Sequence, residues 1–125
     1  MNNTHIRLAR LSTKKYICTL YTGSVEQPIT GCTICFTVKR NWGDADSAAL
    51  FKFTGTSGTT VGISFSGTYG YYLTIGSTYT QSVSSTSGKN ENYHFDHRIH
   101  LTTGEVKVLE EGDFIVTPNV TEYTT

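Results

Sequence analysis

Several kinds of residue are scarce in this chain of 125 residues. It has two prolines, one tryptophan and one methionine, and 16% of its residues are charged, with a formal net charge of zero. So low a charged share excludes disorder driven by charge repulsion, and the neutral balance does not favour binding of nucleic acid. No stretch approaches the roughly 20 apolar residues of a membrane-spanning helix. The N-terminal segment lacks the apolar core of a secretion signal, so we expect neither a membrane partner nor export.

Cysteine is scarce too, and its number is odd. Cys18, Cys32 and Cys35 cannot all pair, and without a secretion signal we expect reduced thiols. Cys32 and Cys35 form a C-x-x-C, but they lie in an expected strand, where positions three apart face opposite sides. A zinc site would need a second ligand pair, and a redox site would need a helix start. We therefore expect buried or half-buried thiols and no cofactor.

The abundant residues favour β-structure. The chain contains 12 glycines and 8 tyrosines, with many serines and threonines. Apolar and polar residues alternate in 15–22, 31–40, 61–66, 69–75 and 92–101, and 105–120 indicates two more short strands around Gly112. About seven to nine short strands at this spacing predict an all-β fold. We expect a single immunoglobulin-like antiparallel β-sandwich over residues 1–125.

The same alternation predicts which side chains face the core, and two stretches depart from it. The expected inward rows are Val61, Ile63 and Phe65 in one strand and Tyr69, Tyr71, Leu73 and Ile75 in the next. In WGDADSAALFKF (42–53), we expect Asp46 to cap one helical turn through Ala48 and Ala49. Residues 76–92 are strongly polar, and they predict a long surface loop with one weak strand at most.

Three of the four histidines fall in NYHFDHRIHL (92–101), which raises the question of a metal site. On a strand, His97 faces inward with Phe95 and Ile99. At about 3.3 Å per residue, His94 and His100 lie roughly 20 Å apart, too far to share an ion bound at about 2 Å. We expect no metal site, and His97 is predicted to be a core histidine with a hydrogen-bonded ring. The outward row consists of His94, Asp96, Arg98 and His100.

No set of residues matches a known catalytic arrangement. The chain has no G-x-S-x-G elbow, and Asp96 and His97 face opposite sides of a strand, which is wrong for an Asp–His pair. Asp44 and Asp46 form a D-x-D, but the glycine and glutamate of a calcium loop are missing. We therefore expect a protein without enzymatic activity.

Aromatic side chains suggest a binding role as an alternative. Trp42 lies in an expected loop, and Tyr72 points away from the face shared by Tyr71 and Leu73, so both are expected at the surface. Together with Tyr79 they would form a platform on which sugar rings stack.

Charge is unevenly distributed along the chain. Residues 1–40 hold six Lys and Arg against one acidic residue, a net charge of +5, and residues 41–125 hold four against nine, a net charge of −5. Oppositely charged ends would favour head-to-tail packing of copies, although such charges are also typical of scattered solvated faces.

Three stretches carry a resemblance to a known family. They are IRLARLSTKKYICTLY (6–21), ITGCTICFTVKRNWGDADSAALFKF (29–53) and YHFDHRIHLTTGEVKVLEEGDFIVTPNVT (93–121). The second is similar to an LTG turn, an F-T-V-K strand and an acidic loop, and the third to a Y-x-Y-D strand, a G-x-V hairpin and a G-x-F-x-V strand. In this order they resemble small virion proteins of tailed bacteriophages and prophages. The resemblance implies an immunoglobulin-like sandwich, similar to the N-terminal module of upper-baseplate proteins, and a structural role without enzymatic activity.

The expected function is therefore that of a virion structural protein, docked in multiple copies at the neck or collar, the baseplate or the head surface. Its expected partners are other virion proteins and copies of itself. Protonation of His94 and His100 near pH 6 is expected to tune assembly. The candidate contact residues, besides the tail beyond Pro118, are Arg7, Arg10, Lys14, Lys15, Trp42, Asp44, Asp46, Tyr72, His94, Asp96, Arg98 and His100.

Two alternatives stay open beside this expectation. One is a host-surface or glycan-binding adhesin module built on Trp42, Tyr72 and Tyr79. The other is a capsid decoration protein that is dispensable for assembly.

Overall fold

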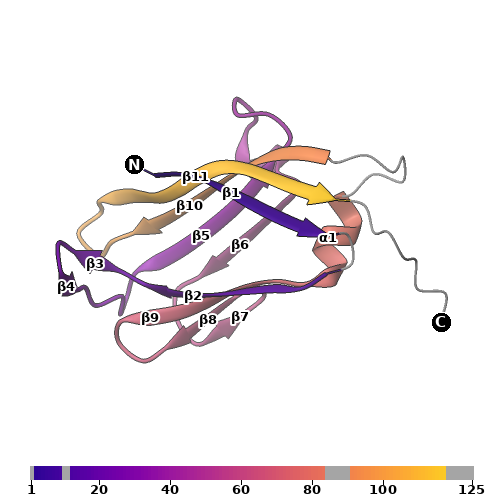
Figure 1. Cartoon of the computed structure of the whole chain (residues 1–125). Coiled ribbons are helices and arrows are strands. Elements are labelled where there is room, and N and C mark those ends of the chain that lie inside the picture. Colours follow the sequence, from indigo (N-terminus) through magenta and orange to yellow (C-terminus); the bar gives the residue numbers. More distant parts are fainter. Residues whose placement is uncertain (1, 10–11, 84–90, 118–125) are drawn as a thin grey trace.

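Two β-sheets stacked face to face make up the structure, a computed structural model that describes residues 2–9, 12–83 and 91–117 (Figure 1). Sheet A contains, in spatial order, β1 (Asn2–Ala9), β11 (Val106–Thr117), β10 (Glu91–His100), β5 (Thr33–Lys39) and β6 (Phe51–Gly55). Sheet B contains β2 (Lys14–Thr19), β9 (Gly70–Ile75), β8 (Ile63–Ser66) and β7 (Thr59–Thr60). These nine strands confirm the predicted immunoglobulin-like β-sandwich.

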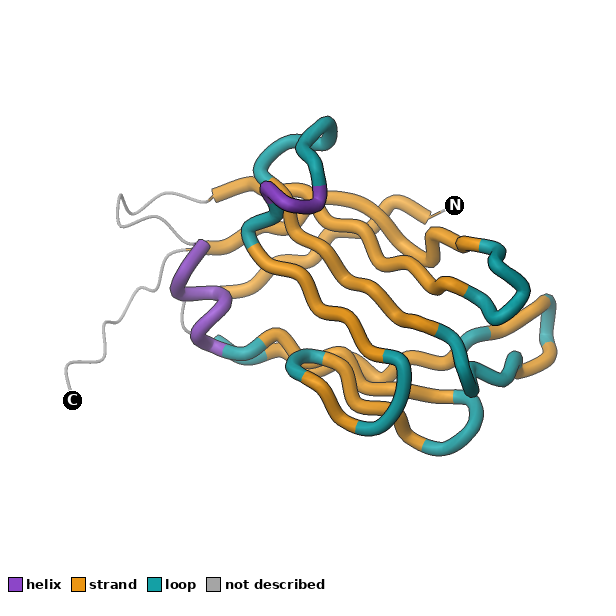
Figure 2. Tube along the Cα trace, turned by 180° about the vertical axis from the view of Figure 1, so that it is seen from behind, coloured by secondary structure: helices purple, strands orange, loops and turns teal. Residues whose placement is uncertain are grey.

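Four short elements complete the described chain. A two-stranded hairpin, β3 (Tyr21–Thr22) and β4 (Val25–Glu26), follows β2. The 3₁₀ helix η1 (Asp46–Ala48) lies in the connection between β5 and β6, and α1 (Ser77–Val83) follows β9. Seen from behind, α1 stands at one end of the sandwich and η1 in a connection that rises beyond sheet A (Figure 2).

One pair of strands departs from the antiparallel pattern. β1 runs parallel to β11, from Asn2 opposite Glu110 to Ala9 opposite Thr117. β1 and β11 are far apart in the chain and are not joined by a hairpin, so no tight turn imposes an antiparallel pairing on them. Because β1 pairs within sheet A, sheet B ends at β2.

The core is formed by the inward rows of both sheets. Phe36 lies at its centre, with its ring centroid 6.1 Å from that of Phe53 and 5.5 Å from that of Phe95. Each such side chain contributes about 1.5–3 kcal/mol on burial. Other buried side chains in the segments with alternating apolar and polar residues include Ile34, Val38, Ile63, Tyr71, Leu73, Ile75, Tyr93, His97 and Ile99.

β5 is buried on both faces, and the two cysteines in it and directly before it are buried as well. Cys32 precedes β5 and Cys35 lies on its outward face, and both are free thiols. Arg98 of the neighbouring strand is directly opposite Cys35, and Asp96 is opposite the buried Thr37. Neighbouring side chains thus cover the outward face of β5, and the expected buried thiols are confirmed.

Two residues of the predicted inward rows are exposed. Val61 precedes the start of β8 at Ile63, and Tyr69 precedes the start of β9 at Gly70. Both lie in turns rather than in strands, so strand alternation does not apply to them. Their assignment to the core was wrong.

The segment 105–120 was predicted as two short strands, but its described part forms one continuous strand, β11. Gly112 lies inside it, opposite Phe95 of β10. The register shifts between His97, opposite Glu110, and Arg98, opposite Val108, so Leu109 is one extra residue on β11. Such a bulge bends the strand without ending it.

The helical turn in 42–53 is confirmed, but its cap is not. Asp46 is the first residue of η1, Ala45 is the N-cap, and that cap makes no side-chain hydrogen bond. The Asp46 carboxylate instead lies 2.8 Å from Lys39 Nζ and 3.2 Å from Lys52 Nζ. Charged partners on β5 and β6 therefore bind the side chain that was expected to cap the turn.

The prediction for 76–92 was wrong in its first half, because residues 77–83 form α1. Tertiary contacts hold the helix despite its polar sequence. The Tyr79 ring lies 5.2 Å from the Phe51 ring and 4.9 Å from the Phe53 ring, and Thr80 Oγ1 donates a hydrogen bond of 3.0 Å to the Ser12 carbonyl. Glu91 and Asn92 already belong to β10, while residues 84–90 and the tail from Pro118 lie outside the described residues.

We predict that Gly62→Ala lowers the free energy of unfolding by about 2 to 4 kcal/mol. Gly62 has a φ of +84°, and an added Cβ would overlap the Phe53 ring. Urea denaturation gives the measurement, with Gly58→Ala as the control, because Gly58 has a φ of +63° and open space around it. The control is expected to lose only about 1 kcal/mol from backbone strain. Equal losses in the two variants would contradict the packing argument.

Candidate functional site

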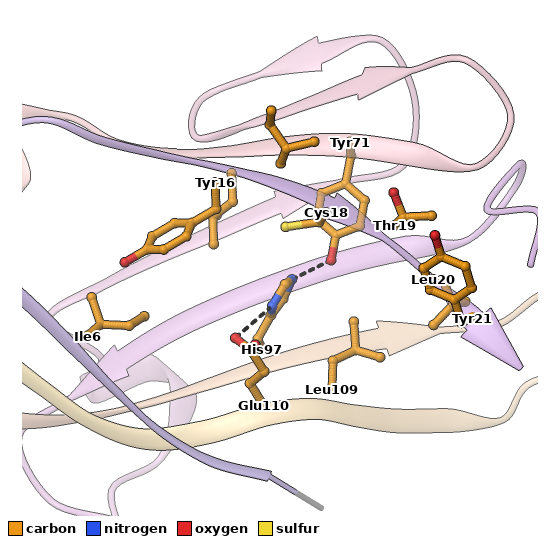
Figure 3. A pocket seen from close by; sticks show the side chains of 12 residues that line it. Ile6, Tyr16, Cys18, Thr19, Leu20, Tyr21, Tyr71, His97, Leu109 and Glu110 are labelled. Atoms are coloured by element: carbon orange, nitrogen blue, oxygen red, sulfur yellow. Dashed lines mark hydrogen bonds and ion pairs between the residues drawn. The ribbon is translucent and has the colours of Figure 1, made fainter. Parts of the chain in front are cut away.

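A buried hydrogen bond joins the two sheets. The Tyr71 hydroxyl on β9 lies 2.6 Å from Nε2 of His97 on β10. Figure 3 shows the Tyr71 side chain reaching from one sheet and the His97 ring from the other. His97 is 4% exposed, so the predicted core histidine with a hydrogen-bonded ring is confirmed. The Phe36 ring lies 6.1 Å from it, edge-on, and fixes its orientation from sheet A.

The protonation states of the flanking groups decide which atoms can donate in these hydrogen bonds. Burial raises the pKa of Tyr71, so the hydroxyl keeps its proton, which it donates to His97 Nε2 where the neutral ring carries its own proton on Nδ1. Burial also raises the pKa of the Cys18 thiol on β2 to about 11, while its hydrogen bond with Tyr71 opposes the rise. The protonated thiol can donate to the Tyr71 oxygen, and with His97 in its Nδ1–H form the hydrogen bonds then run from Cys18 to Tyr71 to His97.

Glu110 on β11 extends this series of contacts beyond His97. Its Oε2 lies 3.9 Å from Nδ1 of His97, too far for a hydrogen bond but within ion-pair range when the ring is protonated. The facing His97 ring lowers the pKa of Glu110, and partial burial opposes this effect. The bulge at Leu109 places Leu109 and Glu110, two successive residues, toward the same side (Figure 3).

These groups line a cavity of about 380 Å³ between the sheets. The cavity lies at the side where β1 and β2 are the outermost strands. At the opposite side of the sandwich, β6 packs against β7 and β8. The side chains that line the cavity include Ile6, Tyr16, Cys18, Leu20, Tyr71, Leu73, His97, Leu109 and Glu110.

A cysteine, a histidine and a glutamate at one cavity invite comparison with a nucleophilic triad. The geometry does not fit one. Tyr71 stands between Cys18 and His97, and a thiol with a pKa of about 11 is almost wholly protonated at neutral pH. The arrangement satisfies buried polar groups and links the sheets.

The Cys18–Tyr71–His97 link lies on strands that have a known structural role in immunoglobulin domains. Strands β2, β9 and β8 follow the B-E-D order of immunoglobulin domains, and β11, β10, β5 and β6 follow the order G-F-C with the added C′ strand of the variable type. In antibody domains a disulfide joins strands B and F, packed against a strand C tryptophan. Here these strands carry Cys18, His97 and Phe36, with Tyr71 as the bridge.

The predicted outward row of β10 lies on the outer face of sheet A. The Arg98 guanidinium donates a hydrogen bond of 2.9 Å to Asp96, and His94 Nδ1 lies 3.7 Å from Asp113. The Trp42 ring, 52% exposed, lies 4.6 Å from the His94 ring. His100, at the end of β10, is exposed.

The acidic loop belongs to the same face. Asp44 Oδ2 accepts a hydrogen bond of 3.1 Å from the Asn41 backbone N–H. Asp46 binds Lys39 and Lys52, and these two lysines hold its pKa at about 2, well below the ordinary value. Lys39 belongs to the positive half of the sequence and Asp46 to the negative half, so these charges are not separated into two ends of the molecule.

The remaining candidates lie near the edges of the sheets. Arg7 on β1 and Lys14 and Lys15 on β2 are exposed, and Lys15 Nζ lies 4.2 Å from the ring of Tyr72 on β9. Lys14 Nζ lies 5.8 Å from the Tyr16 ring. Arg10 falls outside the described residues. The structure thus divides the candidates between the outer face of sheet A and the region around β2.

The three residues of the sugar-stacking platform do not come together. Trp42 covers His94 on sheet A, Tyr72 lies on the outer face of sheet B, and Tyr79 packs on Phe51 from α1. Across residues 2–9, 12–83 and 91–117, no cluster of His, Cys, Asp and Glu is placed to hold a metal ion. Within the same ranges, no helix has the length and apolarity to cross a membrane.

Comparison with known proteins supports the fold. No family model and no curated protein matches the chain. Among solved structures it is similar to the NK cell receptor Nkp44, described as a triggering partner in natural cytotoxicity, with a TM-score of 0.52 and 11% identity. The match covers 95% of this chain and 100% of that chain. Identity this low shows the fold alone, which is immunoglobulin-like.

Sequence reasoning found His97 but not its partners. Tyr71 was predicted to face the core, which is correct, but strand alternation does not say which strand lies opposite in the other sheet. Glu110 was not predicted to face His97, because its position depends on the pairing of β10 with β11. The available signal was that a tyrosine and a histidine were both predicted inside one core. Buried polar groups need hydrogen-bond partners, so these two were candidates to bind each other.

We predict that Tyr71→Phe lowers the free energy of unfolding by about 1–3 kcal/mol, because it leaves the buried His97 Nε2 without its hydrogen-bond partner. The control is Tyr72→Phe on the outer face of sheet B, expected to change stability by less than about 0.5 kcal/mol. Urea denaturation of Tyr71→Phe, His97→Leu and the double variant gives the coupling. Strict additivity of the two single losses would contradict a direct bond.

We predict that Asp46→Asn lowers the free energy of unfolding by about 0.5 kcal/mol at pH 7, a value that allows for solvent screening at a half-exposed carboxylate. The folded-state pKa is about 2, below the ordinary 3.8, so the stabilisation is complete above pH 5 or so. It is lost as the pH falls through 4 toward 2. Urea denaturation at several pH values tests this, with exposed Glu105→Gln as the control. A difference in the free energy of unfolding between wild type and Asp46→Asn that persists at pH 2 would contradict it.

Proposed function

We propose that this chain is a non-catalytic structural protein of a tailed-bacteriophage virion, which docks in multiple copies through protein–protein contacts. The observation that supports docking is the exposure of apolar side chains in the region formed by β2 and the β3–β4 hairpin. Ile17, Tyr21 and Val25 are large apolar residues exposed there, next to the outer edge of sheet B. Exposed apolar side chains beside a strand edge favour pairing with another chain.

The outer face of sheet A offers a second contact surface of a different kind. Its charges are largely paired within the molecule, as Arg98 with Asp96 and Lys39 with Asp46. A partner at this face would meet a mixed polar surface with Trp42 exposed on it. Such a surface selects a partner by matching hydrogen bonds and charges more than by net attraction.

The virion assignment is supported by the sequence motifs in 6–21, 29–53 and 93–121. The sandwich itself is compatible with many roles, because one fold hosts unrelated functions. The glycan-binding alternative receives less support, since Trp42, Tyr72 and Tyr79 lie in three separate places.

We predict that purified particles contain this chain in multiple copies, as quantified by mass spectrometry. Deletion of its gene in the encoding phage is expected to give defective or unstable particles, and a plasmid copy is expected to restore them. A reconstruction of the whole particle is expected to locate the chain at the neck or collar, the baseplate or the head surface.

Other results would favour the alternatives. Deletion particles that eject DNA but fail to adsorb would favour the adhesin module. Deletion particles that assemble and infect normally would favour a decoration protein. Absence of the chain from particles would contradict the virion role.

A further inference from the structure

The outer edge of β2 has features of an unoccupied pairing site. Among the described residues, β2 is paired only on its β9 side. It has no proline, and Ile17 at its middle is 80% exposed. Natural edge strands are commonly protected by charge, but here the lysines are confined to one end, at Lys14 and Lys15. The middle of the edge is apolar and unprotected.

We propose that two copies of this chain pair β2 with β2, antiparallel about a twofold axis, to join their four-stranded sheets into one sheet of eight. This inference rests on the proposed docking function and names its first partner, a second copy. Antiparallel pairing of one strand with its own copy is the arrangement that a closed, symmetric dimer requires.

The side-chain pattern of β2 restricts the register. Directly opposed residues of an antiparallel pair point to the same face, so inward Tyr16 and Cys18 must oppose inward residues, and outward Ile17 must oppose an outward one. Ile17 on the axis satisfies this condition. It faces the second copy's Ile17, and Lys15 then faces the second copy's Thr19.

Charge selects this register over the next one. With Ile17 on the axis, the two copies of Lys15 stand four residues apart, roughly 13 Å, which exceeds the Debye length of about 8 Å at physiological salt. With Tyr16 on the axis, they would stand two residues apart, roughly 7 Å, and repel each other. The Ile17 register thus avoids the one like-charge conflict within the strand.

Opposite charges also meet in this register. Glu26 lines the same surface depression as Thr19, Ile17 and Tyr72. Because Lys15 faces the second copy's Thr19, it approaches the second copy's Glu26. Ile17 lies opposite Tyr72 within its own sheet, so the outer face of the joined sheet carries an apolar row of Tyr72, Ile17 and their two copies.

Sedimentation equilibrium over a range of concentrations tests the pairing. The wild-type chain is expected to dimerise, and Ile17→Lys is expected to raise the dissociation constant at least about tenfold, because it places two like charges on the axis. Val61→Lys is the matched control, since Val61 is also an exposed apolar residue but lies in the turn between β7 and β8. A monomeric wild type, or equal dissociation constants for the two variants, would overturn the proposal.

Cysteine cross-linking tests the register and does not depend on a weakened dimer. Ile17→Cys is expected to form an intermolecular disulfide under mild oxidation, because the two residues oppose each other across the axis. Thr19→Cys alone is expected not to cross-link, but a mixture of Thr19→Cys with Lys15→Cys is. Wild-type protein gives the background from Cys18. Cross-linking of Val61→Cys as fast as that of Ile17→Cys would overturn the register.

Failure of this inference is distinguishable from failure of the proposed function. A chain that is monomeric in solution but present in particles contradicts the β2 pairing and leaves the virion role standing. A chain that dimerises through β2 but is absent from particles contradicts the virion role and leaves the pairing standing.

Discussion

The hydrogen bond between the Tyr71 hydroxyl and His97 Nε2 is the constraint on which the stacking of the two sheets depends. It lies in an otherwise apolar core, where an unpaired hydroxyl or imidazole nitrogen is costly. Interdigitated apolar side chains hold the two sheets together, and the 2.6 Å bond adds a directional contact between fixed positions. Cys18 and Glu110 add one strand from each sheet to the same link. The protein thus joins with side-chain chemistry the strands that antibody domains join with a disulfide.

This link and the parallel pairing of β1 with β11 together shape one side of the molecule. β1 adds its Ile6 and Leu8 to the core from sheet A, so β2 is left as the last strand of sheet B. The cavity beside His97 opens between these two edges. Docking is accordingly expected on this side, where backbone groups, exposed Ile17 and a charged flank occur together.

The sequence predicted which segments form strands better than it predicted the contacts between those segments. Alternation identified the inward faces of β9 and β10, because burial repeats with the period of a strand. It misplaced Val61 and Tyr69, which lie in turns, and it missed α1, whose polar residues are held by Tyr79 and Thr80. It also gave no sign that Glu110 faces His97, since one extra residue at Leu109 sets that register. Contacts between segments far apart in the chain leave no local pattern.

The central claim is that the β2 edge carries the docking role. Hydrogen–deuterium exchange of the isolated chain at low concentration, compared with the chain in assembled particles, tests it directly. The account predicts that amides in 14–19 become protected on assembly, while amides of β7 at the far edge of sheet B exchange at an unchanged rate. Unchanged exchange throughout 14–19 in the particle would contradict it.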